Sequence, residues 1–353
     1  MTVAVIDLDA YRHNIALLAA RMAPAELMVM VKADAYGHGL LPVALTALDC
    51  GIRSIGVLDA ESGLALRSAG IGSEVRLFAW LFSTVEDYRP LIEADIDLGI
   101  SHLHQLERIA AANASRRARL HLKIDTGLHR NGATVEEWPL LVGRALQLQA
   151  SGVVELYGAW THIGEASDRE DTVAIERFDR AIAEAQSLGA SFSMRHLAAS
   201  AAAFARGDAR YDTVRVGAFT YGIAPGGGIG PATLNLRPVM SLQTEVLEVI
   251  GSGSRRFARI PVGFTDGVPA AAAGRVSVSL AGIRMPLVSV GPGHSEIDVS
   301  GGPASAGDAV VLFGTGDSGE QTLQEWADAL DTIGEELAVR VGPRIPRQYR
   351  RTL

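Results

Sequence analysis

The sequence predicts an α/β protein in which a (β/α)8 TIM-type barrel precedes a smaller, mostly antiparallel β domain. Up to residue 223, short apolar runs alternate with amphipathic segments at the spacing of βαβ units. After the glycine- and proline-rich stretch 224–231, strand-like runs follow one another with Gly and Pro turns between them. We therefore expect a barrel at 10–223 and a β domain at 232–353, with residues 1–9 forming a strand that joins the second domain.

Eight apolar runs have the length and composition of barrel strands that are buried on both faces. The expected strands cover residues 27–31, 54–58, 75–79, 97–100, 120–124, 154–160, 194–197 and 213–216. Amphipathic segments lie between them, for example 61–69, 103–112 and 171–188. Their apolar residues recur near helical spacing, so we expect helices that pack on the outside of the barrel.

Short apolar runs also dominate beyond residue 231. They cover residues 241–250, 257–262, 275–280, 285–290 and 309–313. The Gly and Pro turns between them predict a small antiparallel barrel or sandwich. One helical segment is expected near 322–330, and residues 2–8 have the composition of the extra strand.

Composition and charge argue against a nucleic-acid-binding protein, a disulfide-rich protein and a membrane protein. The 353 residues are 48% hydrophobic and carry a net charge of −8, and the basic clusters are short, which argues against a nucleic-acid partner. The single cysteine, Cys50, excludes an intrachain disulfide framework and fits a reducing compartment. No apolar run reaches 18 residues and the amino terminus lacks a signal-peptide pattern. We expect a cytoplasmic protein without a membrane partner.

Lys32 is the candidate for covalent chemistry. It follows the apolar run 27–31 and lies in the segment V-K-A-D-A-Y-G-H-G, residues 31–39. Active sites of α/β barrels lie at the carboxyl ends of the strands, where an amine that loses hydration becomes nucleophilic because its pKa falls. Such a lysine can form the Schiff base of pyridoxal phosphate enzymes. The alternative is a strand-end lysine whose ammonium group reaches solvent along an apolar surface.

The segment 31–39 resembles the cofactor-lysine signature of the alanine racemase family, V-K-A-x-A-Y-G-H-G. The similarity extends over nearly the whole chain, from I-D-L-D-A at 6–10 to R-I-P-R-Q-Y at 344–349. It implies a pyridoxal 5'-phosphate (PLP)-dependent racemase that interconverts L- and D-alanine, or a related small amino acid, in D-amino-acid metabolism. It also implies a homodimer in which each β domain completes the active site of the partner.

The resemblance implies roles for Lys32, Tyr36 and Arg130. Lys32 would hold PLP as a Schiff base, and the hydroxyl of Tyr36 would donate to the cofactor phosphate. The segment K-I-D-T-G-L-H-R, which ends at Arg130, resembles K-x-D-T-G-x-x-R. The arginine of that motif contacts the phenolic oxygen of the cofactor and the substrate carboxylate, and a guanidinium fork suits both anions. Lys123 would be a supporting residue, which some relatives carry as a carbamate.

Two further motifs imply groups beside the cofactor. The segment T-H-I-G-E-A-S-D resembles T-H-x-x-x-A-x-D and implies that His162 lies against the cofactor ring. Without the motif, a strand-end histidine would more simply be a core residue. The segment H-L-A-A-S corresponds to H-x-x-N-S, so Ser200 would bind the phosphate and His196 would support a neighbouring arginine. Ala199 replaces the asparagine of the motif, which removes one polar contact.

Arg215 is the second mechanistic residue that the resemblance implies. Its segment, V-R-V-G-A-F-T-Y-G, resembles V-R-x-G-x-x-x-Y-G. An arginine that faces the pyridine nitrogen keeps that nitrogen unprotonated, which weakens the electron sink and favours proton return over transamination. The backbone N–H groups of Gly217 and Ala218 would bind the phosphate.

Two positions depart from the family pattern. The motif P-x-G-Y-x-D-G supplies a tyrosine for proton transfer on the second face, and here it reads P-V-G-F-T-D-G with Phe264. The motif G-R-x-x-M-D corresponds to S-V-G-P-G-H, which ends at His294. Phenylalanine cannot transfer a proton, whereas histidine titrates near neutral pH, so His294 is the candidate replacement. Loss of one general acid or base typically costs about 10²- to 10⁴-fold in rate.

The departures leave two alternatives to racemisation. The first is a PLP enzyme with one-sided chemistry, such as transamination, aldol cleavage or elimination, in which Lys32 acts alone. The second is a non-catalytic PLP-binding paralogue. Arg215 argues against a decarboxylase, which places a carboxylate at the pyridine nitrogen. A metal site is not expected, because His102 and His104 lack further ligands at suitable spacing.

Overall fold

The computed structural model describes residues 1–165, 167–252 and 255–351. The chain forms two compact units, which we describe separately. The barrel unit comprises Leu17–Lys32 and Ala47–Gly217, and the second unit comprises Met1–Ala16, Ala33–Thr46 and Ala218–Leu353.

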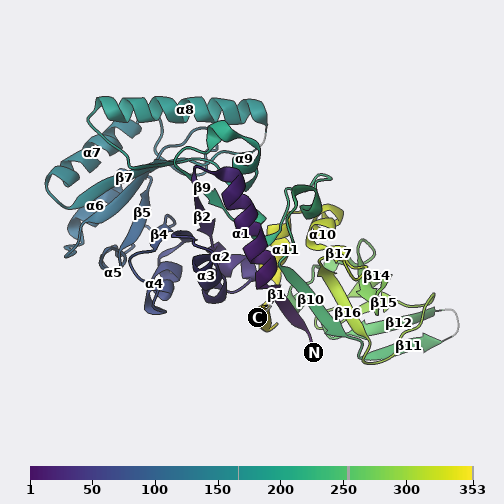
Figure 1. The fold of residues 1–353 in the computed structure, drawn as a ribbon. Coiled ribbons are helices and arrows are strands. Elements are labelled where there is room, and N and C mark those ends of the chain that lie inside the picture. The colour runs from purple at the N-terminus through teal and green to yellow at the C-terminus, as the bar shows by residue number, and fades with distance from the viewer. Residues whose placement is uncertain (166, 253–254, 352–353) are drawn as a thin grey trace. The chain divides into compact units, whose positions relative to one another are not determined.

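Parallel strands form the wall of the barrel unit (Figure 1). They are β2 (Glu26–Met30), β3 (Ser54–Leu58), β4 (Arg76–Ala79), β5 (Ile96–Ile100), β6 (Ala118–Lys123), β7 (Val154–Trp160), β8 (Met194–His196) and β9 (Thr213–Val216). The order is β9-β2-β3-β4-β5-β6-β7-β8. Two backbone hydrogen bonds link the ends of this order, from Asp212 N to Arg195 O and from Arg215 N to Ala198 O, both 3.1 Å. The predicted barrel is confirmed.

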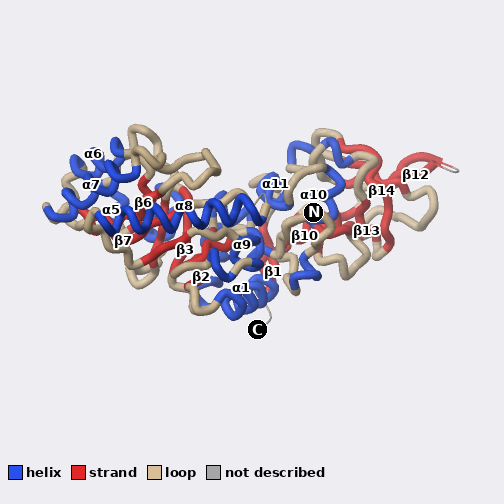
Figure 2. The backbone as a smooth tube through the Cα atoms, turned by 90° about the horizontal axis from the view of Figure 1, so that it is seen from above, coloured by secondary structure: helices blue, strands red, loops and turns tan. Residues whose placement is uncertain are grey.

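Helices lie outside the strands, as Figures 1 and 2 show. They include α4 (Ala60–Ser68), α5 (Arg89–Glu93), α6 (Leu103–Ala111), α7 (Trp138–Ala150), α8 (Asp168–Ser187) and α9 (Ser200–Ala205). Helix α8 starts earlier than the apolar pattern predicts because Ser167 caps it: the Ser167 hydroxyl accepts a hydrogen bond from Glu170 N. Its buried face includes Ile175, Phe178 and Ile182, so it packs against the barrel as an amphipathic helix should.

The second unit contains a mostly antiparallel sheet, in agreement with the predicted fold class. Its strands are β1 (Val3–Asp7), β10 (Met240–Glu245), β11 (Glu248–Ser252), β12 (Arg255–Ile260), β13 (Ser277–Leu280), β14 (Ile283–Val290), β15 (Ser295–Asp298), β16 (Ala309–Gly314), β17 (Gln321–Thr322) and β18 (Arg347–Arg350). The order is β11-β12-β15-β14-β13-β16-β10-β1-β18, with β17 beside β16. Strand β1 pairs with β10 and β18, so the first and last strands of the chain are sheet neighbours.

One expected strand, residues 241–250, is two strands in the structure. The chain changes partners between β10 and β11: Val246 N donates to Asp308 O (2.9 Å), and Leu247 N donates to Arg259 O (2.8 Å). Apolar composition cannot reveal this exchange of partners, because both halves are strand-like.

Helices complete the second unit. They are α1 (Leu8–Met22), whose last turns belong to the barrel unit, α2 (Lys32–Gly37), α3 (Leu40–Asp49), α10 (Leu323–Leu330) and α11 (Gly334–Arg340). Helix α10 matches the expected segment 322–330 and is capped by the Thr322 hydroxyl. Among the described residues, no helix is both long enough and apolar enough to cross a bilayer.

Trp138 offers a test of the packing between α7 and α8. Its side chain is fully buried, and its Nε1 donates to Ala181 O (2.8 Å). Trp138→Ala should lower the free energy of unfolding by about 3–5 kcal/mol, because it opens a large cavity and removes a buried hydrogen bond. Urea unfolding followed by circular dichroism measures this. Val135→Ala is the control: Val135 is 61% exposed, so its loss should change stability by no more than about 0.5 kcal/mol. Equal effects would contradict the described packing.

Candidate functional site

Five neighbouring barrel strands carry the predicted site residues of the barrel unit. Lys32 follows β2, Arg215 lies in β9, and Gly217 follows β9 directly. The other three come after β8, β7 and β6 and are Ser200, His162 and Arg130. Because β6, β7, β8, β9 and β2 are consecutive in the wall, these residues lie at its carboxyl-terminal edge. Barrel enzymes place their chemistry at this edge.

A left-handed turn follows Lys32 immediately. Residues 33–36 all have φ between 52° and 54°, a conformation that costs about 1–2 kcal/mol for each non-glycine residue. Contacts within the second unit hold the turn: Leu40 N donates to the Asp34 carboxylate (2.7 Å), and Arg347 Nε donates to Gly37 O (3.0 Å). Gly37 cannot be replaced easily, because an added Cβ would lie 2.6 Å from Ala338 O. The chain therefore leaves Lys32 along a fixed path.

Arg215 is a buried cation at the centre of the barrel-unit residues. Its Nη1 donates to His196 Nδ1 (3.0 Å), and its Nη2 lies 2.8 Å from Thr161 O, 3.0 Å from Leu197 O and 3.1 Å from His162 Nδ1. Burial, followed by repulsion from Arg130, lowers the pKa of Arg215 to about 9. The guanidinium is still charged at neutral pH.

Lys123 adds a buried amine. Its Nζ contacts Asn131 Oδ1 and lies 4.4 Å from the centre of the Trp160 ring. Burial, with smaller contributions from Arg215 and Arg130, lowers the pKa of Lys123 to about 7. Lys32 and Lys123 are the only lysines among the 353 residues, against 30 arginines. Both side-chain amines of the protein therefore belong to the candidate site.

His162 is neutral in this environment. Burial lowers the pKa of His162 well below its usual value, and the surrounding cations lower it further. Those cations are Arg215, Arg130, Lys123 and Lys32. Since Arg215 Nη2 approaches Nδ1, that nitrogen accepts and Nε2 carries the proton. Three cations, together with Lys123, whose pKa of about 7 leaves its amine partly charged, favour a ligand with several negative groups, such as a phosphate and a carboxylate.

Ser200 and Gly217 form a small polar pair at the same edge. Gly217 N donates to Ser200 Oγ (3.2 Å), and Ser200 is the first residue of α9. Ala199, which precedes it, offers no side-chain cap to the helix, in keeping with the missing asparagine. The pair combines a hydroxyl and a backbone N–H that an anion could share.

Tyr36 and Ala218 belong to the second unit. Tyr36 is 6% exposed, and its ring centre lies 4.9 Å from that of Tyr221. Burial, and to a lesser extent Glu335, raises the pKa of Tyr36, so its hydroxyl keeps its proton and can donate. Ala218 begins a short 3-10 helix, Ala218–Tyr221, directly after Gly217.

The two departures from the family pattern lie on adjoining loops of the second unit. Phe264 N donates to Gly291 O, and Thr265 N donates to Pro292 O, both at 2.9 Å. Gly291 N donates to His294 O (2.8 Å), so the loop that carries His294 is closed on itself beside Phe264. Phe264 is 48% exposed, and His294 is also exposed. Both residues therefore lie on hydrogen-bonded loops and are exposed.

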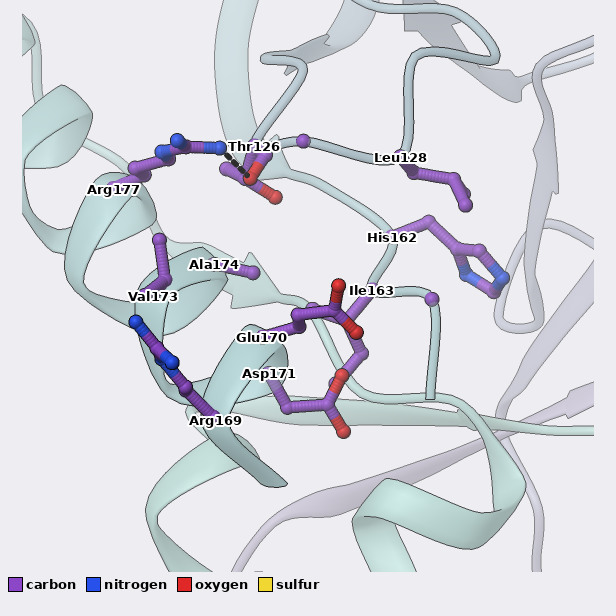
Figure 3. A pocket seen from close by; sticks show the side chains of 12 residues that line it. Thr126, Leu128, His162, Ile163, Arg169, Glu170, Asp171, Val173, Ala174 and Arg177 are labelled. Carbon is purple, nitrogen blue, oxygen red and sulfur yellow. Dashed lines mark hydrogen bonds between the residues drawn. The ribbon is translucent and has the colours of Figure 1, made fainter. Parts of the chain in front are cut away.

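A cavity of about 360 Å³ with both apolar and charged side chains in its lining lies beside His162. The loop at 126–128, the segment after β7 and the first turns of α8 enclose it (Figure 3). Arg177 Nη1 donates to Thr126 O (3.0 Å) at one side, and the carboxylates of Glu170 and Asp171 line another. The cavity gives the His162 side of the site a charged wall.

The resemblance implied that His196 supports a neighbouring arginine, but the sequence did not predict the groups behind His196. Asp97 and His121 form a buried hydrogen-bonded pair that leads to His196, and Trp160 stacks on His196 with ring centres 5.6 Å apart. The only local signal was one histidine inside the apolar run 120–124. The two histidines at 102 and 104 stack on each other, and no group of metal-ligating side chains is found among the described residues.

Comparison with known proteins gives consistent matches along the chain. Residues 6–225 match the family model "Alanine racemase, N-terminal domain", and residues 247–349 match "Alanine racemase, C-terminal domain". The alanine racemase of Frankia casuarinae is 42% identical over 98% of this chain and 95% of that protein, and that of Thermobifida fusca is 39% identical over 98% and 96%.

Solved structures agree. The alanine racemase of a D-cycloserine-producing Streptomyces lavendulae has a TM-score of 0.96 and 36% identity, covering 100% of this chain and 97% of that one. The Bacillus anthracis enzyme with bound L-Ala-P has a TM-score of 0.89 and 26% identity, covering 99% and 95%.

The low pKa of Lys123 can be measured directly because the chain has two lysines. In protein labelled with ¹³C-lysine, the Cε signals report protonation of each amine. We expect a midpoint near pH 7 for the Lys123 signal, with the amine charged below and neutral above it, because burial disfavours the charged form. Lys123→Met identifies the signal by removing it. A midpoint near 10.5 would contradict the described burial.

Proposed function

The chain belongs to the alanine racemase family, and on that premise we propose that it interconverts L- and D-alanine with PLP bound at Lys32. One observation carries the proposal most: at the strand ends the buried guanidinium of Arg215 donates to the neutral His162 (3.1 Å), and Lys32 and Arg130 help to lower the pKa of that histidine. The cofactor brings a phosphate and a phenolic oxygen, and alanine brings a carboxylate. A site with several cations suits these anions.

We propose that the chain holds the cofactor with residues from both units. They are Lys32, Tyr36, Arg130, His162, Ser200, Arg215, Gly217 and Ala218, with Arg130 also binding the substrate carboxylate. Bound PLP supplies the electron withdrawal that makes the Cα proton of alanine acidic. Ser200 and Gly217 contribute a hydroxyl and an N–H that suit a phosphate, and the protonated Tyr36 hydroxyl suits it as well.

Arg215 favours racemisation over transamination in this proposal. A guanidinium has donors only and stays charged at neutral pH, so it can donate to a ring nitrogen that carries no proton of its own. Keeping that nitrogen unprotonated limits the electron withdrawal, so a proton removed from Cα returns to Cα in preference to another position.

Inversion needs a proton-transfer group on each face of Cα. Lys32 serves one face. Phe264 stands where the family pattern has tyrosine and has no proton to give, so we propose His294, on the adjoining loop, for the other face. Both residues would reach the site from the partner subunit of a homodimer with shared active sites. The exposure of this surface in the single chain supports that role.

The remaining assignments follow from the same premise. We propose a domain division at residues 1–9, 10–223 and 232–353, in which the first strand completes the sheet of the second domain. A cytoplasmic location fits an enzyme that produces D-alanine from L-alanine.

Isotope exchange tests the function. In deuterated water, either alanine enantiomer should acquire deuterium at Cα and give the other enantiomer, as ¹H NMR and chiral chromatography can show. Exchange without inversion would indicate a PLP enzyme that transfers protons on one face only. Absence of exchange in cofactor-loaded protein would indicate a protein that binds the cofactor without catalysis.

Borohydride treatment and peptide mass spectrometry should find the cofactor on the Lys32 peptide, with the Lys123 peptide as internal control. Lys32→Ala should lose both attachment and exchange.

His294 and Phe264 give a second test. His294→Ala should lower the rate of inversion by about 10²- to 10⁴-fold, the usual cost of a lost acid or base, while the cofactor still attaches to Lys32. His104→Ala, which removes another exposed histidine, should leave the rate unchanged. Phe264→Tyr should raise the rate, because it restores a hydroxyl. Unchanged inversion in His294→Ala would rule out this assignment.

A further inference from the structure

A buried chain of polar side chains crosses the interior of the barrel unit and ends at Arg215. It begins at Asp97 in β5, passes through His121 in β6 and His196 at the end of β8, and reaches Arg215 in β9. The distances are 3.1 Å from His121 Nε2 to Asp97 Oδ2, 2.9 Å from His121 Nδ1 to His196 Nε2, and 3.0 Å from Arg215 Nη1 to His196 Nδ1. All four side chains are at most 5% exposed.

The two ends of the chain have fixed hydrogen-bonding roles. Burial alone would raise the pKa of Asp97, but His121, Arg76 and Arg119 lower it to about 2, so the carboxylate is an acceptor only. Arg119 Nε donates to its other oxygen (2.6 Å). Arg215 is a donor only.

These ends dictate the tautomer of each histidine. His121 must donate from Nε2 to Asp97, and burial lowers its pKa, so the ring is neutral and Nδ1 accepts. His196 must then donate from Nε2, and its own Nδ1 accepts from Arg215. A proton on His196 Nδ1 would face the N–H of Arg215, so a charged His196 does not fit. Every donor in the chain therefore points toward Asp97.

Gly158, in strand β7 of the barrel wall, leaves the space that the His121 ring needs. A Cβ at Gly158 in β7 would lie 2.3 Å from His121 Nδ1, the atom that accepts from His196. Gly158 does not have a positive φ. Glycine is therefore needed at this position to leave space for His121, and not to allow an unusual backbone conformation. Phe78 and Trp160 pack against the His196 ring and confine it.

We propose that Asp97 and His121 are positioning residues: through His196, they form a one-directional hydrogen-bond chain that fixes the orientation of the Arg215 guanidinium. The four contacts of Arg215 described above use Nη1 and Nη2, and none of them uses Nε–H. The chain thereby sets the plane in which Arg215 meets a ligand. This inference deepens the proposed racemase function and rests on it for the catalytic consequence, but not for the tautomers.

The tautomers can be tested in the protein without cofactor. Two-bond ¹H–¹⁵N correlation spectra of ¹⁵N-histidine protein should show His121 and His196 as Nε2–H tautomers that do not titrate between pH 6 and 8. Single His→Gln variants assign the signals. Either ring found as the Nδ1–H tautomer, or protonated at pH 7, would overturn the proposal.

Two variants test the link to Arg215. Asp97→Asn introduces a donor at the start of the chain, and Gly158→Ala displaces His121 without changing any titratable group. Each should change the His196 tautomer signal and lower kcat for alanine by about 10- to 100-fold, with KM changed less than about twofold, because the displaced arginine acts on the reaction more than on substrate binding. Asp95→Asn is the matched control: Asp95 also pairs with Arg119 but is not a member of the chain.

The outcomes separate the two proposals. Native tautomers in Asp95→Asn and altered tautomers with reduced kcat in either test variant support the positioning role. Native kcat in both Asp97→Asn and Gly158→Ala would overturn it. If the unaltered protein shows the expected tautomers but no alanine racemisation, the proposed function fails while the directed chain stands. If Asp97→Asn does not fold, Gly158→Ala alone tests the positioning role.

Discussion

The burial of one guanidinium, that of Arg215, governs the organisation of the site. A buried charge is tolerated only when its hydrogen-bonding capacity is met. Here the ends of β7 and β8 turn the carbonyls of Thr161 and Leu197 toward it, and His162 and His196 supply ring nitrogens. Burial lowers the pKa of Lys123 and of His162, and in both cases the charge of Arg215 is the next largest cause. The protonation states of these two groups therefore depend on Arg215 as well as on burial.

The second unit stabilises the backbone turn that follows Lys32. The left-handed turn after Lys32 is unfavourable locally, and the Asp34 and Arg347 contacts stabilise it. Arg347 comes from β18, which pairs with β1. The strands at the two ends of the chain therefore support the segment that follows Lys32, although β18 is distant from it in sequence.

Much of the fold could be predicted because its signals are local. Strands β3, β7 and β9 have the expected bounds, since each is an apolar run of strand length. The Asp97 to Arg215 chain could not be predicted, because it depends on the register that brings His121 beside Gly99 across β5 and β6. The left-handed turn has little local signal either, since Ala33, Ala35 and Tyr36 do not favour positive φ. The roles of the site residues came from motif resemblance and not from apolar patterns.

The scarcity of lysine has a chemical consequence for a protein that handles an aldehyde. Its other basic side chains, apart from histidine, are arginines, which stay protonated and do not form Schiff bases with simple monoaldehydes. Among the side chains, amine-directed reagents and simple monoaldehydes would therefore find only the amines of Lys32 and Lys123. The chain therefore carries almost no amine that competes with the site for a carbonyl, so its chemical modification pattern is a direct report on that site.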